Sequence, residues 1–457
     1  MLIKSISGIR GTIGGMPGEA LTPPDVVKFT TGYALWVREQ SGAESPTVVI
    51  GRDARPSGLM ISSLVSSILN SIGVDVIDLG LSTTPTVELA VTELKAQGGI
   101  ILTASHNPKN WNALKLLNAR GEFLSKAAGE RVLEFSESSV DYSPVDNLGA
   151  TKYDGTWFDW HVKHVCELDL VNPELIRSAG LKVAVDGVNS SGGIVIPKLL
   201  EALGVEVVKL HCEPNGQFAH NPEPLPAHLV DLSEAVTANG CHLGISVDPD
   251  VDRLCFVSED GSFFGEEYTL VAVADYVLSK TPGNTVSNMS STRALNIVTE
   301  KHGCIYTASA VGEVNVVEQI RATNAIIGGE GNGGVIYPTS HAGRDALVGV
   351  GLFLTHLVEQ GLSCSELRST YPDLVICKYK IDLPDLGVEE ALDKLVKNHP
   401  EARINLADGV KFDLDEGWVH LRRSNTEPII RVYAEAPNED AANTLAGRFK
   451  SELLSLL

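Results

Sequence analysis

The serine at position 105 is the first residue whose setting could support chemistry. Residues 98–112 read GGIILTASHNPKNWN, so an apolar, strand-like run ends at Ser105, which is followed directly by His106. The GxSxG elbow of serine hydrolases does not match, because Thr103 and Asn107 stand where that motif has glycine. A histidine next in sequence does not establish a catalytic triad. Two interpretations stay open here: a reactive serine, or an ordinary loop between a strand and a helix.

Three aspartates in the stretch GISVDPDVDRLCFV form a second candidate site. Asp248, Asp250 and Asp252 alternate along a β-branched run, and alternate side chains of an extended chain share one face. Carboxylates that converge repel one another unless a cation neutralises them, and oxygen ligands suit a hard ion such as Mg²⁺. A calcium EF-hand loop is disfavoured, although Glu259 falls at its twelfth position, because Arg253 stands where that loop needs glycine. We expect a divalent-metal loop, with a solvated acidic turn as the alternative.

A glycine-rich stretch, IIGGEGNGGVIYP, is the third candidate site. Its glycines at 329, 331 and 334 formally satisfy GxGxxG, but the strand-like VIYP follows where a dinucleotide site needs a helix. Glycine lets a backbone approach a ligand closely, and Glu330 and Asn332 offer acceptors and donors. We expect recognition of ligand hydroxyls, with a glycine-rich hairpin as the alternative.

The stretch LRRSNTEPIIRVYAEA gathers hydrogen-bond donors of several kinds around one turn. The planar guanidinium group of arginine can donate two hydrogen bonds to one phosphate. Successive backbone N–H groups of a loop can also bind an anion. A solvated strand end is the alternative. The expected anion clamp consists of Arg422, Ser424, Asn425, Thr426 and Arg431.

One pattern of elements recurs three times and must position these loops. Residues 48–79, 181–210 and 285–312 each pass from a β-branched run through a polar loop into a helical pattern and then a second strand. A strand–helix–strand unit implies parallel pairing, and its repetition predicts three similar α/β domains, although any α/β chain produces some look-alikes. Each helical pattern ends at a glycine, which favours the left-handed conformation that often closes helices: Gly73, Gly204 and Gly303.

The last part of the chain differs, because alternating runs such as GWVHLRR flank helical segments, which indicates a smaller α+β domain. The fold class predicted is therefore α/β, with three similar mixed α/β domains and a smaller C-terminal α+β domain around a central cleft. The predicted ranges are 1–150 with the serine loop, 151–257 with the metal loop, 258–370 with the glycine-rich loop and 371–457 with the clamp.

Composition narrows the class of protein. A chain of 457 residues is too long for a single hydrophobic core, which predicts two to four domains. A composition of 43% hydrophobic and 21% charged residues is ordinary for a globular protein. The most apolar stretch, residues 346–358, is too short to cross a bilayer, and no signal peptide is evident. Seven scattered cysteines without a CxxC pair favour a reducing cytoplasm over a disulfide framework or zinc site.

Net charge excludes one class of partner and poses a question about another. The formal charge of −22 argues against nucleic acid, whose binding depends on basic residues that neutralise phosphates. An anionic substrate would therefore require cations concentrated locally against the overall field.

Taken together, a serine able to carry phosphate, a metal triad, a hydroxyl-reading loop and a separate clamp describe phosphoryl transfer on a sugar. The stretches TASHNP, DPDVDR, GEGNG and RRSNTEP occur in this order. With them, the chain resembles the α-D-phosphohexomutases, the sugar-phosphate mutases, along essentially its whole length. The resemblance implies Mg²⁺-dependent, reversible interconversion of hexose 1-phosphate and 6-phosphate through a phosphoserine and a 1,6-bisphosphosugar, with a hexose 1,6-bisphosphate as activator.

The resemblance also implies a role for each site residue. Ser105 would be the phosphoserine, and its phosphate would hold Mg²⁺ together with Asp248, Asp250 and Asp252. Glu330 and Asn332 would bind the sugar, and the clamp residues would bind the opposite phosphate. The remaining residues implied at the active site are Arg10 in SGIRG, Lys115 for acid–base work, His106 beside the serine and Arg253, which would touch the phosphoserine.

Three departures leave the sugar open. Ala113 stands where the family usually has glycine, Asn332 replaces the commoner serine, and Gly334 replaces the commoner histidine. The stretches GEGNG and TASAVGEVNV look most like the amino-sugar branch, which favours glucosamine phosphate. A glucose or mannose phosphate enzyme is the next alternative, followed by a metal-dependent sugar phosphatase and a non-catalytic sensor. We expect a cytoplasmic monomer or homodimer with a phosphosugar substrate and neither nucleic acid nor membrane as partner.

Overall fold

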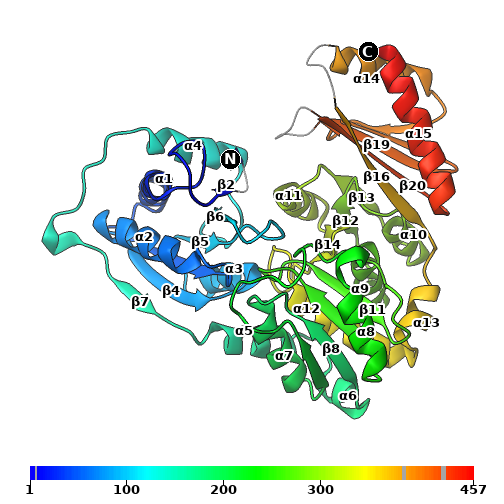
Figure 1. Cartoon of the computed structure of the whole chain (residues 1–457), viewed down its shortest axis with the longest axis horizontal. Helices are drawn as coiled ribbons and strands as arrows, with labels where there is room; N and C mark the ends of the chain where they lie inside the picture. The colour runs from blue at the N-terminus through cyan, green and yellow to red at the C-terminus, as the bar shows by residue number, and fades with distance from the viewer. Residues whose placement is uncertain (6–7, 383–386, 424–428) are drawn as a thin grey trace.

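The computed structural model describes residues 1–5, 8–382, 387–423 and 429–457. Four domains follow one another along the chain, and Figure 1 shows the first at the left, the second and third below and to the right, and the fourth above the third. No helix in these ranges combines the length and the hydropathy that a membrane crossing requires.

Domain 1 is built on a seven-stranded sheet of order β1-β2-β6-β5-β3-β4-β7. Its strands are β1 Leu2–Ser5, β2 Gly8–Thr12, β3 Thr47–Arg52, β4 Asp75–Leu81, β5 Gly98–Leu102, β6 Trp111–Leu117 and β7 Thr151–Tyr153. Its helices are α1 Pro23–Ser41, α2 Gly58–Ser71, α3 Thr84–Glu93 and α4 Lys126–Ser136. Strand β3 pairs in parallel with β4 and β5, whereas β6 returns antiparallel to β5. The loops after β3 and β5 therefore meet at one edge of the sheet.

Domain 2 has a four-stranded sheet of order β11-β10-β8-β9, and domain 3 has one of order β13-β12-β14-β15. The elements of domain 2 are α5 Trp157–Cys166, α6 Pro173–Ser178, β8 Lys182–Asp186, α7 Gly192–Ala202, β9 Glu206–Leu210, α8 Val230–Ala238, β10 Leu243–Val247 and β11 Leu254–Ser258. Those of domain 3 are α9 Glu266–Lys280, β12 Thr285–Asn288, α10 Ala294–Lys301, β13 Tyr306–Ser309, α11 Glu313–Thr323, β14 Ile327–Glu330, β15 Gly334–Ile336, α12 Ala346–Gln360 and α13 Cys364–Ser369. Two short 3-10 turns, η1 Val145–Asn147 and η2 Pro226–His228, complete the connections.

Domains 2 and 3 share one hydrophobic core. Phe256 of β11 stacks on Phe353 of α12 with ring centroids 3.7 Å apart. Helix α12 is apolar on every side and is buried from Ala346 to Leu357, which is the pattern of a helix enclosed by neighbours. The loops of these two domains are therefore positioned by one packed unit.

Domain 4 is a five-stranded antiparallel sheet of order β16-β20-β19-β18-β17 with its own core. Its strands are β16 Val375–Asp382, β17 Arg403–Asn405, β18 Val410–Leu414, β19 Gly417–Arg423 and β20 Ile429–Ala436. Helices α14 Val388–Asn398 and α15 Glu439–Leu456 cover it. This is the smaller α+β domain that the sequence predicts.

The predicted fold class is confirmed. Each of the three repeated units forms a parallel pair, β3 with β4, β8 with β9 and β12 with β13. The glycines that follow their helices have positive φ angles of 76°, 78° and 70° at Gly73, Gly204 and Gly303. Each sheet also holds an antiparallel strand, so the three domains are mixed rather than purely parallel.

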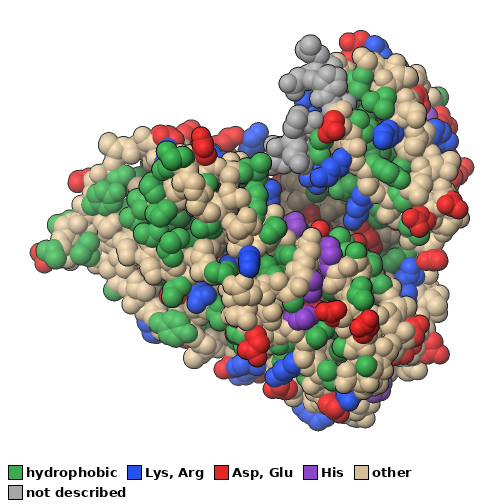
Figure 2. Space-filling view, in the orientation of Figure 1, with side chains coloured by type: hydrophobic (Ala, Val, Ile, Leu, Met, Phe, Trp, Pro, Cys, Tyr) green, Lys and Arg blue, Asp and Glu red, His purple; other side chains and the backbone are tan. Residues whose placement is uncertain are grey.

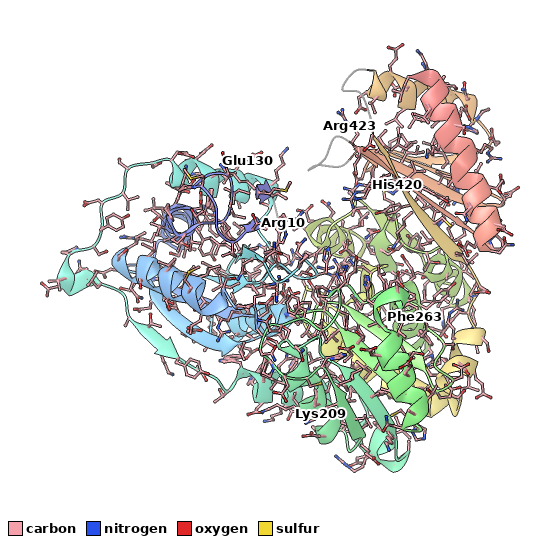
Figure 3. The ribbon with its side chains drawn as sticks, viewed as in Figure 1. Arg10, Glu130, Lys209, Phe263, His420 and Arg423 are labelled. Carbon is pink, nitrogen blue, oxygen red and sulfur yellow. The ribbon has the colours of Figure 1, made fainter. Side chains whose placement is uncertain are left out.

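Figure 2 shows the face of the molecule hollowed between domain 1 and domain 4. Histidine side chains and several Lys or Arg side chains gather along this hollow. Figure 3 places Arg10 on the side of domain 1 that faces domain 4, and His420 and Arg423 on the facing side of domain 4.

Candidate functional site

Ser105 lies in the loop after β5, with its backbone in the left-handed region at a φ of 49°. Its hydroxyl donates to Asp248 Oδ2 at 2.7 Å and lies 3.4 Å from His106 Nδ1. Its backbone N–H donates to Thr103 Oγ1 at 3.0 Å. A conformation that costs free energy in a non-glycine residue persists only where the surroundings impose it. The loop therefore presents Ser105 to an aspartate 143 residues further along the chain.

Arg55, in the loop after β3, imposes that conformation. Its Nη2 donates to the carbonyl oxygens of Ser105 and of residue 107, the latter at 2.7 Å. Its Nη1 donates to the carbonyl oxygens of residues 108 and 111, at 2.6 and 3.1 Å. Its Nε donates to Asp53 Oδ2 at 2.8 Å, and Thr103 donates to the same oxygen at 2.6 Å. Both members of the Asp53–Arg55 pair are buried, so one ion pair organises the whole serine loop.

The aspartate loop connects β10 to β11, and its shape differs from the prediction. Asp248 to Arg253 form a tight turn, not an extended strand, with Val251 at a φ of 63°. The three carboxylates nevertheless converge: all are buried, and one oxygen of each lies within 4.8 Å of the others. The turn brings them together because the two strands that it joins pair antiparallel from Val247 and Leu254.

The donor set fits a hard divalent ion. Asp250 Oδ1 and Asp252 Oδ1 are buried and have no hydrogen-bond partner among the described residues. The second oxygen of each is held: Asp250 Oδ2 accepts from Thr84 Oγ1 at 2.5 Å and from Lys115 Nζ at 2.7 Å. Buried carboxylate oxygens without a partner are costly unless a cation occupies the space beside them. Mg²⁺, which prefers oxygen ligands, suits this set.

The electrostatic environment of the triad also favours a bound cation. Burial, followed by the charges of Asp252 and Asp250, raises the pKa of Asp248 well above its usual range. Burial also opposes the ionisation of Asp250, but the charge and hydrogen bond of Lys115 outweigh it and lower that pKa. The carboxylates of the triad therefore repel one another, and a cation bound among them would relieve this repulsion.

Lys115, on β6, and Arg253 are two of the cations that contact the triad. Lys115 Nζ lies 3.6 Å from Asp252 Oδ2 in addition to its bond with Asp250. Burial alone would lower the pKa of Lys115, but Asp250 and Asp252 raise it, so the amine stays charged. Arg253 Nε lies 4.0 Å from Asp248 Oδ2 and from Asp252 Oδ1.

His106 is a neutral imidazole in this setting. Its Nδ1 accepts from Arg253 Nη2 at 2.8 Å, and burial followed by the Arg253 charge lowers its pKa to about 2. A neutral ring beside Ser105 can accept or donate one hydrogen bond without adding charge.

Arg10 lies on β2, opposite Ala113 of β6 in the register. Its Nε is buried and has no partner among the described residues. Burial lowers the pKa of Arg10, and the charge of Arg431 in domain 4 lowers it further. The two guanidinium groups therefore lie within electrostatic range of each other across the hollow, an arrangement that an anion between them would stabilise.

The glycine-rich stretch is the hairpin of β14 and β15. Glu330, the last residue of β14, accepts at Oε1 from Asn288 Nδ2 at 2.8 Å and from Gly312 N at 3.1 Å. Its Oε2 accepts from Arg344 Nη1 at 3.0 Å. Asn332 Oδ1 accepts from the backbone of Gly334 at 3.2 Å, which leaves its amide nitrogen as a donor for a ligand.

Domain 4 brings two of the predicted clamp arginines together. Arg422 of β19 lies directly opposite Arg431 of β20, which in turn lies opposite Lys380 of β16. Directly paired residues share a face of the sheet, and like charges in such pairs are destabilising. Asp408 Oδ2 lies 3.4 Å from Arg422 Nε and also accepts from Val311 N of domain 3 at 3.1 Å. Ser424, Asn425 and Thr426 lie outside the described residues.

Several residues at this site were not anticipated from sequence: Asp53, Arg55, Thr84 and Arg344. The stretch GRDARPSG, which holds the first two, follows the first strand of the first repeated unit. Polar residues at the carboxyl end of a parallel strand commonly line a site. This stretch could therefore have been predicted from the sequence to be part of the site. Nothing local marks Arg344, which contacts the site only through the tertiary structure.

Four consecutive domains of one family match the chain: phosphoglucomutase/phosphomannomutase alpha/beta/alpha domain I at residues 2–141, domain II at 159–261, domain III at 265–374 and the C-terminal domain at 380–451.

Relatives match over nearly their whole length. A probable phosphoglucosamine mutase of Methanopyrus kandleri is 33% identical over 97% of this chain and 96% of its own. A phosphoglucomutase/phosphomannomutase of Thermococcus kodakarensis is 34% identical over 94% and 95%. The crystal structure of a phosphoglucomutase/phosphomannomutase family protein from Burkholderia thailandensis superposes with a TM-score of 0.84 at 26% identity, over 100% of this chain and 98% of that one.

Proposed function

The chain belongs to the phosphoglucomutase/phosphomannomutase family, and we propose that it interconverts hexose 1-phosphate and hexose 6-phosphate, with glucosamine phosphate as substrate. The observation that carries the proposal is the 2.7 Å contact between the Ser105 hydroxyl and Asp248. Beside it, Asp250 and Asp252 each have a buried carboxylate oxygen that accepts no hydrogen bond from the described residues. A serine so placed can carry a phosphoryl group next to a bound divalent ion.

Asp248, Asp250 and Asp252 would hold the Mg²⁺ together with the phosphate on Ser105. When bound, the ion would stabilise the negative charge that develops on the moving phosphoryl group. The serine loop, fixed by Arg55, keeps the Ser105 oxygen at this position while the sugar changes.

The reaction conserves the phosphoryl group. The bond between phosphorus and Ser105 Oγ breaks, a bond forms to the free hydroxyl of the 1-phosphosugar, and the hydroxyl proton ends on Ser105 Oγ. Lys115, which is charged, would give a proton to Ser105 Oγ as that bond breaks and regain one from the sugar hydroxyl. The resulting 1,6-bisphosphosugar turns over and returns its other phosphate to Ser105. A hexose 1,6-bisphosphate would therefore also prime an enzyme whose serine carries no phosphate.

Local cations answer the question posed by the net charge. A phosphoserine carries about −1.5 to −2 at neutral pH, and it adds to three carboxylates. Two unit charges about 4 Å apart repel by roughly 4 kcal/mol at intermediate dielectric. Lys115 and Arg253 contact this cluster. Together with Arg10 they would offset the repulsion that an incoming phosphate meets.

The clamp would bind whichever phosphate is not being transferred. Arg422 and Arg431 face the same side of the sheet of domain 4, and an anion between them would relieve their mutual repulsion. Ser424, Asn425 and Thr426, which follow Arg423 in the sequence, would complete this clamp. The sugar hydroxyls would meet the β14–β15 hairpin, where Asn332 offers its amide nitrogen and Glu330 its carboxylate.

Glucosamine phosphate is favoured because the relatives from Methanopyrus kandleri and Methanosarcina barkeri, 33% and 31% identical, are named as probable phosphoglucosamine mutases. The second candidate is a glucose or mannose phosphate, since the relative from Thermococcus kodakarensis is named a phosphoglucomutase/phosphomannomutase at 34% identity.

The test is a coupled assay with glucosamine, glucose, mannose and N-acetylglucosamine phosphates, each primed with its bisphosphate. The expected result is the highest kcat/KM on glucosamine phosphate, with no net release of inorganic phosphate. Ser105→Ala should abolish turnover, whereas Ser138→Ala, at an exposed serine of the same domain, should not. Mutase turnover by Ser105→Ala at the wild-type rate would contradict the carrier role, and stoichiometric phosphate release would identify a phosphatase instead.

A further inference from the structure

Arg344 joins the two loops on which the proposed reaction depends, although it belongs to none of the motifs that predict it. It precedes Asp345, the N-cap of helix α12, and its side chain is 10% exposed. Its Nη2 donates to Asp252 Oδ2 at 2.7 Å, its Nη1 to Glu330 Oε2 at 3.0 Å and its Nε to Glu313 Oε2 at 2.9 Å. Each nitrogen of the guanidinium group thus engages a carboxylate of a different segment.

The contact with Asp252 determines which of its oxygens is available. Oδ2 accepts a hydrogen bond from Arg344, whereas Oδ1 is buried and accepts no hydrogen bond from the described residues. Asp250 shows the same division, with Oδ2 held by Thr84 and Lys115 and Oδ1 left open. Residues that fix one oxygen of a ligating carboxylate orient the other, and loss of such a partner commonly weakens metal affinity about 10–100-fold.

The contact with Glu330 extends this support to the hairpin of β14 and β15, which would bind the sugar and is called the sugar hairpin below. Glu330 ends β14 in domain 3, and Asp252 lies in the aspartate loop of domain 2, 92 residues before Arg344. A guanidinium group whose donors form a rigid planar fork holds its partners at fixed relative positions. A shift of either loop would therefore strain the hydrogen bond to the other.

Gly334 leaves the space that Arg344 uses. A Cβ atom at position 334 would lie 2.3 Å from Arg344 Cδ, closer than such atoms approach, and 3.0 Å from Cγ, which is a tight contact. The φ angle of Gly334 is not in the left-handed region, so the space taken by Arg344, and not the backbone conformation, favours glycine here. This is also the position at which the chain departs from the commoner histidine.

We propose that Arg344 is a positioning residue that ties the aspartate loop to the sugar hairpin, and that Gly334 is required because it makes room for this side chain. The inference rests on the proposed function and extends it: divalent-ion binding and sugar binding would be supported by one guanidinium group. Removing the group should therefore weaken both.

Metal binding supplies a readout that does not depend on turnover. Mn²⁺ titrated into the full-length protein by calorimetry should bind Arg344→Met about 10–100-fold more weakly than wild type. In the sugar phosphate assay, the same variant should show a raised KM. Arg344→Lys keeps the charge but cannot span three carboxylates, so it should recover only part of both losses.

Gly334→Ala tests the same idea without removing the arginine, which keeps the proposal testable if Arg344→Met fails to fold. Displacing the Arg344 side chain should weaken Mn²⁺ binding and raise KM together. Two controls should change neither quantity: Gly129→Ala, where an added Cβ meets nothing within 4 Å, and Arg177→Met, an exposed arginine of domain 2.

Three outcomes would overturn the proposal. The first is Mn²⁺ affinity within twofold of wild type in a folded Arg344→Met protein. The second is weaker metal binding with an unchanged KM, which would show that the two loops are not coupled. The third is a Gly334→Ala protein that matches wild type in both measurements. If wild type binds Mn²⁺ but turns over no sugar phosphate, the proposed function fails. The Mn²⁺ titrations would still test whether Arg344 positions the Asp252 carboxylate for metal binding.

Discussion

Replacing Arg55 with methionine should disable the serine loop without touching the serine. The substitution keeps an unbranched side chain of similar length but removes the guanidinium group. That group donates to four backbone carbonyl oxygens of the loop and pairs with Asp53 at 2.8 Å. In its absence the carbonyl oxygens lose their donor, and Asp53 is left as a buried carboxylate without a cation.

The size of the effect follows from these contacts. Removing one partner of a buried ion pair costs about 3–5 kcal/mol. Burial raises the pKa of Asp53, and Arg55 is foremost among the groups that oppose this rise, so the remaining carboxyl would become harder to ionise. The fall in kcat comes from the loop itself, because hydrogen bonds from a charged donor contribute about 1.5–3 kcal/mol each. At about 1.36 kcal/mol per tenfold change in rate, losing two such bonds from the reactive geometry corresponds to a fall in kcat of roughly 10²–10⁴-fold.

The assay is steady-state turnover of the preferred sugar phosphate, with circular dichroism and gel filtration to establish folding. Arg52→Met is the matched control, because the Arg52 side chain makes one hydrogen bond to the described residues, at 3.2 Å to the backbone carbonyl oxygen of Asp53. Asp53→Asn combined with Arg55→Met removes the unpaired charge, so it should restore stability but not kcat. A folded Arg55→Met enzyme with kcat within threefold of wild type would refute the reasoning.

Three further outcomes are expected. Chelation of divalent ions should stop wild-type turnover, and Asp250→Asn should need at least about tenfold more Mg²⁺ for half-maximal rate; full activity in chelator would contradict the metal assignment. Arg422→Ala should lower kcat/KM about 10–150-fold if a charge-assisted hydrogen bond worth about 1.5–3 kcal/mol is lost, and an unchanged kcat/KM would exclude it from the clamp. His220, 2.9 Å from Asp186, has a raised pKa, although burial opposes this. Its stabilising contribution should be complete below about pH 6.5 and disappear as the pH rises through the folded-state pKa, so urea midpoints of His220→Gln should converge on wild type at high pH.

Local patterns predicted much of this protein. The three repeated units were visible because strand and helix periodicities, and the glycines that end helices, depend on neighbours in sequence. The convergence of Asp248, Asp250 and Asp252 was predicted from spacing, and the dinucleotide interpretation was rejected from the strand after Gly334. The extended geometry assumed for the aspartates was wrong, because a turn with Val251 at a φ of 63° brings the carboxylates together.

The contacts that make a site of these loops were decided by tertiary structure. Lys115 and Asp250 are 135 residues apart, and Arg55 reaches Ser105 across 50. Arg422 meets Arg431 only through the register of β19 and β20. Sequence by itself determined which residues could bind phosphate, metal or hydroxyls, because side-chain chemistry and short-range periodicity are local. Which of their atoms meet was decided by the packing of sheets from different domains, because no local pattern encodes the distance between loops that belong to separate cores.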